Sequence, residues 1–340
     1  MQNSNPIIAQ PFSGERVWNT QSSLEPQTRF SLSAEGVAKN CAEELASLAE
    51  DSTSGDGSIE NFIPPQFRLD ACRELAASVR TVLDQGPGFA IIDGFPIVDR
   101  SPHTIRLMYW SFMSLIGRPV AQTFTGEMIY DVQDDRVQAE LGKGVRSSKT
   151  ADGQVYHTDN HPRPPSYVSL LCLQTAEEGG LSGLINLYEV YNRLLEYYSD
   201  RIPRMYQPFW FDRQREHEPG ESPVSRNPIF EIGENGLTIR VVTTLIRQGY
   251  QLAGETLDLE TCEALDALDE VMEAPGLGKT FEFRPGQVQV VNNRRIGHRR
   301  TAFRDASEPE KRRHLIRLWL RDEGERSLFQ FAGGPPGHPR

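Results

Sequence analysis

The chain has 340 residues, a formal net charge of −11, and apolar and charged fractions of 38% and 24%. This length allows one large or two ordinary domains, and no apolar run is long enough for a membrane span. The acidic balance argues against a nucleic-acid-binding surface, and the N-terminus lacks a secretory signal pattern. Four scattered cysteines favour reduced thiols. We therefore expect a cytoplasmic protein with a small-molecule partner, whose oligomeric state the sequence does not indicate.

The N-terminal part of the chain predicts an arm followed by helices. Residues 1–30 are polar and lack periodicity, and they are predicted to form an N-terminal arm. A weak helical pattern covers Ala34–Leu48. Apolar residues recur at helical spacing over Leu69–Leu83 and again over Ile105–Ile116, and a buried strand is predicted between them at Phe89–Ile92.

After Gly117 the sequence changes to short apolar segments that are interrupted by Gly, Pro and Asp. These segments predict strands at Gln122–Phe124, Met128–Val132, Val155–Thr158, Ser166–Leu173 and Leu184–Leu187. Several short strands with frequent turns are typical of a β-sandwich or a β-barrel.

A partly helical insertion is predicted at about 189–275, within a single domain that spans 31–330. Its predicted parts are a helix at Glu189–Tyr198, an irregular stretch at Pro203–Pro228, a strand at Leu237–Thr243, and a helix at Leu257–Met272 with Leu259 and Cys262 facing inward. The closing strands are predicted at Thr280–Phe283, Gln287–Val291 and Arg313–Leu320. Residues 331–340 have the composition of a disordered tail.

The stretch from Tyr156 to His161 carries the most informative pattern. In an extended segment, the side chains of His157 and Asp159 point the same way. The prolines that begin at Pro162 prevent a helix, which argues against a helical zinc motif built on His157 and His161. Two ligands do not hold a catalytic metal, so a third must come from elsewhere. Two histidines and one carboxylate are the ligand set of non-haem Fe(II) oxygenases, although a His-x-Asp triplet alone is weak evidence.

A second informative region lies near the C-terminus. His298 follows a strand that ends in two asparagines. On the predicted strand Arg313–Leu320, alternation places Arg313 and Arg317 on one face, and both faces are otherwise apolar. Buried arginines need anions. The anions could be internal Asp or Glu residues, or carboxylate ligands that match the shape of the guanidinium group.

These motifs together resemble those of the TauD/TfdA-type Fe(II)/2-oxoglutarate-dependent dioxygenases, and in particular the clavaminate synthase-like members. The resemblance covers roughly residues 89–321. Its specific parts are HTD at 157–159, GGLS at 179–182, RPGQVQVVNNRRIGHRR at 284–300 and RRHLIRLWL at 312–320. It implies a mainly β fold with flanking helices, in which a double-stranded β-helix, or jelly roll, carries the helical insertion.

The resemblance also implies roles for individual residues. His157, Asp159 and His298 match the iron ligands, and Arg313 matches the arginine that binds the distal carboxylate of 2-oxoglutarate. Ser182 stands where the family often has a threonine that donates to the same carboxylate. The implied substrate contacts are Arg317, which faces an acidic group of the substrate, and Gln122, Tyr130, Ser147 and His161.

The implied reaction consumes 2-oxoglutarate and O₂, releases succinate and CO₂, and oxidises a C–H bond of a small organic acid or amino-acid-like substrate. Hydroxylation is the default outcome, and desaturation, epoxidation and ring closure remain open. Asp159 argues against halogenation, because halogenating relatives have a small residue there. Two other classes remain: a non-catalytic metal-binding jelly roll, and a zinc-dependent hydrolase or isomerase with the same triad. A buried arginine such as Arg313 has no use in a mere metal-binding module.

Overall fold

The computed structural model describes residues 7–25, 27–51, 59–62, 68–137, 147–160, 162–217, 220–233 and 236–322. The predicted tail at 331–340 lies outside these residues. The helices of the described part are α1 (Val37–Asp51), α2 (Asp70–Asp84), α3 (Pro102–Ile116), α4 (Leu187–Tyr197), α5 (Ile202–Met205), α6 (Thr243–Ala253) and α7 (Leu259–Glu273). None of the helices in this part is long and apolar enough to cross a membrane.

The larger sheet has seven strands, of which β4 (Ile129–Val132) pairs with β17 beside the main path. The strand order along that path is β1 (Arg29–Ser31), β2 (Phe89–Asp93), β14 (Val288–Asn292), β6 (Tyr167–Gln174), β17 (His314–Arg321) and β3 (Arg118–Val120). Most pairs are antiparallel, and β1 with β2 is parallel. Strands that are distant in sequence thus lie side by side in the middle of the sheet.

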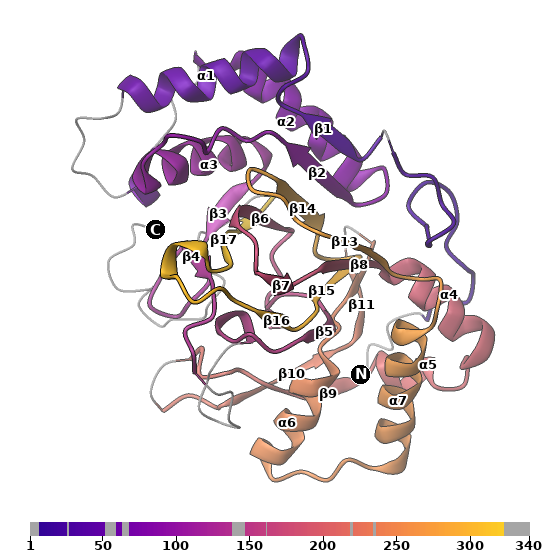
Figure 1. Cartoon of the computed structure of the whole chain (residues 1–340). Coiled ribbons are helices and arrows are strands. Elements are labelled where there is room, and N and C mark those ends of the chain that lie inside the picture. The colour runs from indigo at the N-terminus through magenta and orange to yellow at the C-terminus, as the bar shows by residue number, and fades with distance from the viewer. Residues whose placement is uncertain are drawn as a thin grey trace.

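A smaller sheet of four strands packs against the larger one (Figure 1). Its strand order is β13 (Lys279–Phe281), β8 (Ser182–Asn186), β15 (Ile296–Arg300) and β5 (Gln154–His157). Val168 and Val291 of the larger sheet share one buried cluster with Leu184 and Ile296 of the smaller sheet. Two facing sheets of this kind form the jelly roll that the sequence predicts.

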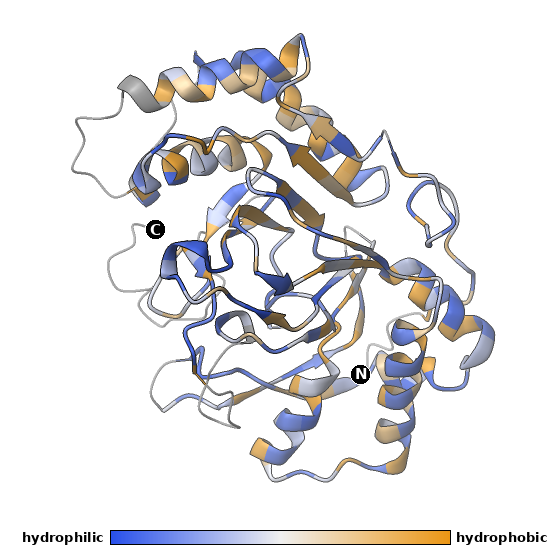
Figure 2. Ribbon diagram, in the orientation of Figure 1, coloured by the Kyte–Doolittle hydropathy of each residue, from blue (hydrophilic) through white to orange (hydrophobic). Residues whose placement is uncertain are grey.

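Helices α1, α2 and α3 cover the outer face of the larger sheet (Figure 1). The alternation predicted for β17 is confirmed, because Ile316, Leu318 and Leu320 pack into the core beneath these helices. Figure 2 shows that the helices are amphipathic, whereas β2 is hydrophobic along most of its length. The opposite face of β17 is therefore turned toward the smaller sheet.

The segment between β8 and β13 forms a second core beside the smaller sheet. The stretch Pro203–Pro228, expected to be irregular, contains a hairpin of β9 (Pro208–Asp212) and β10 (Val224–Pro228). A second pair of strands, β11 (Phe230–Gly233) and β12 (Gly236–Ile239), follows it. Phe209 and Phe211 alternate into this core, a period-two signal that the prolines and charges around it obscured.

Several local predictions are wrong. Gln122–Phe124 is a bend and turn rather than a strand, and the edge strand of this region is β3, which ends at Val120. The strand predicted to reach Thr243 ends at Ile239, and α6 begins at Thr243. In α7, Leu259 is 74% exposed because it lies in the first turn, directly after the Asp258 N-cap. Cys262 is only partly buried.

The N-terminal arm lies along the body of the protein over its described residues. Trp18 is buried, and its indole N–H donates to the carbonyl oxygen of Pro87 at 2.7 Å. Phe12 stacks on Tyr188 of α4 with ring centroids 4.0 Å apart. Two aromatic contacts therefore hold an otherwise polar segment. The division of the chain into an arm, one domain with an insertion, and a tail stays a prediction.

Candidate metal centre and substrate cavity

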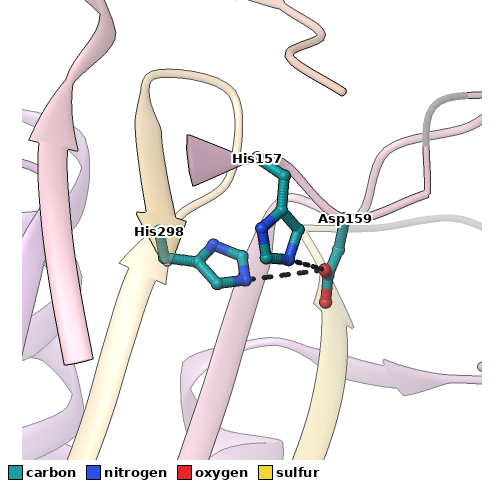
Figure 3. A group of neighbouring side chains, drawn as sticks. All are labelled: His157, Asp159 and His298. Atoms are coloured by element: carbon teal, nitrogen blue, oxygen red, sulfur yellow. Dashed lines mark ion pairs between the residues drawn. The ribbon is translucent and has the colours of Figure 1, made fainter. Parts of the chain in front are cut away.

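His157, Asp159 and His298 meet at one point between the two sheets (Figure 3). His157 ends β5 and His298 lies opposite it on β15, so the ladder between these strands brings the imidazoles together. Their Nε2 atoms lie 3.6 Å and 3.5 Å from the Oδ1 atom of Asp159. One ligand atom from each residue lies within 4.8 Å of the others. Two imidazole nitrogens and a carboxylate oxygen fit a divalent transition metal such as Fe(II).

The protonation of His157 suits a metal ligand. Its Nδ1 atom lies 2.9 Å from the carbonyl oxygen of Val155, which can accept only from Nδ1–H. The Nε2 lone pair is then directed at the metal position. Burial, and then the nearby charge of His298, lower the pKa of His157 to about 4. The ring is therefore neutral at pH 7, as metal binding requires.

The two carboxylate oxygens of Asp159 have different partners. Its Oδ1 atom faces the two imidazoles, whereas Oδ2 accepts a hydrogen bond of 2.6 Å from the indole N–H of Trp319. The Nη1 atom of Arg317 lies 3.2 Å from the same Oδ2 atom. Burial alone would raise the pKa of Asp159, but Arg317 and the histidines outweigh it and lower the pKa. The carboxylate is thus ionised and oriented to offer one oxygen to a metal.

Asn293 fixes the backbone of Asp159. Its side-chain oxygen accepts from the Asp159 backbone N–H at 2.9 Å, and its Nδ2 atom donates to the Asp159 carbonyl oxygen at 3.0 Å. Asn293 is fully buried between β14 and β15. Two reciprocal bonds therefore set the position of a ligand that lies just beyond the end of its strand.

The triad opens into a cavity of about 670 Å³. The larger sheet contributes Leu170, Leu315, Arg317 and Trp319 to its wall, and Arg313 lies just before β17. The smaller sheet contributes His157, Ser182 and His298. The remaining wall comes from the insertion, through β10, α6 and the end of β9. The two sheets thus hold one side of the cavity, and the insertion holds the other.

Arg313 is the buried cation that the sequence predicts on this strand. It is 5% exposed, and no acidic side chain of the described residues forms an ion pair with it. Its Nη1 atom is buried and has no hydrogen-bond partner. Burial lowers the pKa of Arg313 to about 10, which leaves it charged at pH 7. A charged, buried guanidinium with an unsatisfied donor on a cavity wall is suited to bind a carboxylate of a ligand.

Ser182 lies on the same wall but is already engaged. Its hydroxyl donates to the Oε1 atom of Gln289 at 3.0 Å. The Nε2 atom of Gln289 is buried and has no partner. A hydroxyl has a single proton, so Ser182 must turn it away from Gln289 to donate to a ligand.

The remaining predicted substrate contacts either lie away from the cavity or fall outside the described residues. Gln122 and Tyr130 do not line the described cavity, and both contact Arg317 instead. The Oε1 atom of Gln122 accepts from the Nε atom of Arg317 at 2.7 Å. The centroid of the Tyr130 ring lies 5.0 Å from the Cζ atom of Arg317. The structure gives them a role in positioning Arg317. The side chain of Ser147 and the whole of His161 lie outside the described residues. Ser148, next to Ser147, lines the cavity.

Arg317 pairs with an internal Asp, which is one of the two alternatives that the sequence leaves open. The partner is Asp159, the predicted metal ligand. Nothing in the sequence indicates the hydrogen bond from Trp319 to Asp159. The sequence indicates Asn293 only as part of the motif RPGQVQVVNNRRIGHRR at 284–300.

Several known proteins resemble this chain. FR-33289 synthase of Streptomyces rubellomurinus is 27% identical over 333 residues, which cover 95% of this chain and 94% of that protein. The taurine hydroxylase-like protein SAT17 of Stachybotrys chartarum is 28% identical and covers 76% of this chain and 68% of its own length. Asparagine oxygenase superimposes with a TM-score of 0.61 at 20% identity, over 88% of this chain and 94% of that chain. The non-haem iron oxygenase OrfP gives 0.62 at 16%, over 87% and 94%.

A facial arrangement of two histidines and a carboxylate inside a jelly roll defines the class of non-haem iron oxygenases. Residues 55–319 match the family described as "Taurine catabolism dioxygenase TauD, TfdA family". The chain belongs to this family. It is a 2-oxoglutarate-dependent dioxygenase that uses iron, as the sequence motifs predict.

Proposed function

We propose that this dioxygenase hydroxylates a small, amino-acid-like substrate that carries a carboxylate. In the proposal, His157, Asp159 and His298 hold Fe(II), and Arg313 and Ser182 hold the distal carboxylate of 2-oxoglutarate. The iron, when bound, supplies activation of O₂ and of the 2-oxo acid at the three coordination positions that a facial triad leaves open.

The observation that carries the proposal is the state of Arg313. A buried arginine costs free energy unless it meets an anion, and the guanidinium of Arg313 forms no ion pair in the described part of the chain, although Asp305 accepts from its backbone N–H. It lines the same cavity as the triad. A dicarboxylate that binds the metal through its 2-oxo acid end would satisfy Arg313 with its other end. A non-catalytic metal module does not require this residue.

Arg317 supports a substrate that carries a carboxylate. Its side chain lies on the cavity wall beside Asp159, and Gln122 and Tyr130 fix its position. In the proposal Arg317 has two roles: it orients the ligand Asp159, and it attracts the acidic group of the substrate to the side of the metal. The fork of a guanidinium can serve two carboxylates at once.

The relatives are in line with this substrate class. One solved structure of asparagine oxygenase contains Fe(II), 3-hydroxyasparagine and succinate. A structure of OrfP contains iron, succinate and a hydroxylated arginine. Both are amino acids with a carboxylate, and they support a similar class for this chain without indicating which compound it is.

The test is succinate formation. Purified protein with Fe(II), 2-oxoglutarate and O₂ is expected to release succinate slowly, and faster when an amino-acid-like substrate is added. Arg313→Ala should release little succinate at moderate 2-oxoglutarate and recover at high concentration. Wild-type protein that binds zinc and hydrolyses esters or amides but makes no succinate would favour the zinc-dependent alternative instead.

A further inference from the structure

Asp212 is a buried carboxylate on the outer wall of the cavity that the proposed chemistry does not use. It is the last residue of β9, it is 6% exposed, and it lines the cavity that contains the triad. Phe209 and Phe211 alternate into the core of the insertion, so Asp212 projects from the opposite face of the strand. Strand geometry and not a flexible loop therefore directs it toward the cavity.

Only one oxygen of Asp212 is engaged. Its Oδ1 atom accepts from the backbone N–H of Gln214 at 2.7 Å, and Oδ2 has no hydrogen bond in the described part of the chain. No basic side chain there forms an ion pair with Asp212. Burial raises its pKa, and the charge of His217 lowers it only in part. The free-energy cost of burying this carboxylate is therefore not offset by an ion pair.

The other acidic residues of this wall, Glu216 and Glu221, have partners that lie outside their own turn. Glu221 forms an ion pair of 2.9 Å with Arg213, and Glu216 accepts from the backbone N–H of Phe124 at 2.7 Å. Both are also more exposed than Asp212. Among the acids that the described part of the β9–β10 hairpin places on the cavity, Asp212 is the most buried, and its only hydrogen bond comes from its own turn.

We infer that Asp212 recognises a cationic side-chain group of the primary substrate, an ammonium or a guanidinium. The inference rests on the proposed function, since it concerns the molecule that shares the cavity with 2-oxoglutarate. Arg313 and Arg317 place positive charge on the inner wall. Asp212, by contrast, places a buried negative charge on the outer wall, where Arg213 is already paired with Glu221. A substrate with a carboxylate at one end and a cation at the other is complementary to both walls.

Matched probes test this directly. L-arginine is compared with L-citrulline, whose side chain is a neutral isostere, and L-ornithine with L-norleucine, for binding to protein loaded with Fe(II) and 2-oxoglutarate without oxygen. Wild type should bind at least one cationic member about tenfold or more tightly than its neutral partner, as measured by calorimetry. The two pairs distinguish a guanidinium from an ammonium.

Asp212→Asn is the informative variant, because the amide oxygen can still accept from Gln214 and keep the loop in place. It should remove the preference for the cation and leave the affinity for the neutral probe within about twofold. Glu221→Gln is the matched control: it removes a negative charge from the same wall, and the preference should persist.

Three results would overturn the inference. They are a wild type that binds none of the cationic probes, a preference that survives Asp212→Asn, and a preference that Glu221→Gln abolishes equally. Failure of the proposed function itself looks different: wild-type protein with Fe(II), O₂ and 2-oxoglutarate would then form no succinate. The binding measurement requires no turnover, so the two failures can be told apart.

Discussion

The two walls of the cavity are built in different ways. The inner wall consists of strands from both sheets, and its polar groups hold one another: Asp159 is bonded by Trp319, Arg317 and Asn293. The outer wall comes from the β9–β10 hairpin and α6, and there Asp212 has a single bond. The Asp159 carboxylate at the metal position is thus held by several side chains, whereas Arg313 on the inner wall and Asp212 on the outer wall each keep a polar atom without a hydrogen-bond partner among the described residues.

This difference indicates that the two walls have different functions. Groups that are fully bonded within the protein can be held in place before any ligand arrives, which is what a metal site and a reaction centre require. Groups that are only partly bonded lose little by exchanging a contact for one with a substrate. Under the proposed function, the inner wall determines the reaction, and the outer wall contributes to the choice of substrate. The predictions below test the inner wall, beginning with the largest effect.

Loss of a triad ligand should have the largest effect. His157→Ala, Asp159→Ala and His298→Ala are each expected to abolish Fe(II) binding and turnover, because two ligands do not retain a catalytic metal. The fold should survive, since the hydrophobic clusters of both sheets remain intact. Calorimetry with Fe(II) and circular dichroism measure the two quantities.

The surface histidine His103 on α3 provides the control, and His103→Ala should bind iron as wild type does. Full activity in any of the three triad variants would remove that residue from the metal site. Asp159→Gly should likewise lose turnover, and it opens a coordination position that chloride could take.

Arg313→Ala should have the next largest effect. A charge-assisted hydrogen bond is worth about 1.5–3 kcal/mol, so the Kd for 2-oxoglutarate should rise roughly 10- to 100-fold. Arg304→Ala is the control, because Arg304 is exposed and pairs with Glu177 and Glu178 at the surface. Unchanged binding of 2-oxoglutarate by Arg313→Ala would show that another cation holds the distal carboxylate.

The inner wall was largely predictable from the sequence, and the outer wall was not. His157 and Asp159 lie two residues apart, and strand alternation correctly placed Arg313 and Arg317 on one face. Such arguments work because regular strands convert spacing into direction. Asp212 follows an aromatic strand surrounded by prolines and charges, and whether its carboxylate is compensated depends on residues distant in sequence.

Trp319→Phe should weaken metal binding by about tenfold, within the range for residues that support a ligand. The phenyl ring keeps most of the packing, but the hydrogen bond to the Oδ2 atom of Asp159 is lost. Trp110→Phe is the matched control, since its N–H donates to the Phe62 carbonyl oxygen, away from the metal. An equal Fe(II) affinity in both variants would mean that Arg317 and Asn293 orient Asp159 without the help of Trp319.

The pKa of His157 predicts how the stability of metal-free protein depends on pH. The folded pKa of about 4 lies below the ordinary value of 6.5, so the unfolded chain binds a proton that the folded chain does not. The contribution of His157 to stability is therefore complete above pH 6.5 and is lost as the pH falls toward 4. Thermal melts should show a smaller decline over this window for His157→Gln than for wild type. Parallel declines would mean that His157 is not held neutral.

Ser182→Ala should have the smallest effect, a rise of about fivefold in the Michaelis constant for 2-oxoglutarate, because one ordinary hydrogen bond is worth about 1 kcal/mol. Ser182→Thr keeps a hydroxyl on the same strand and should remain close to wild type. Ser111→Ala is the control, since that hydroxyl bonds a carbonyl within α3. If Thr at position 182 raises the constant and Ala does not, the site requires a small side chain rather than the hydroxyl of serine. If neither does, Ser182 serves Gln289 alone and Arg313 holds the distal carboxylate without it.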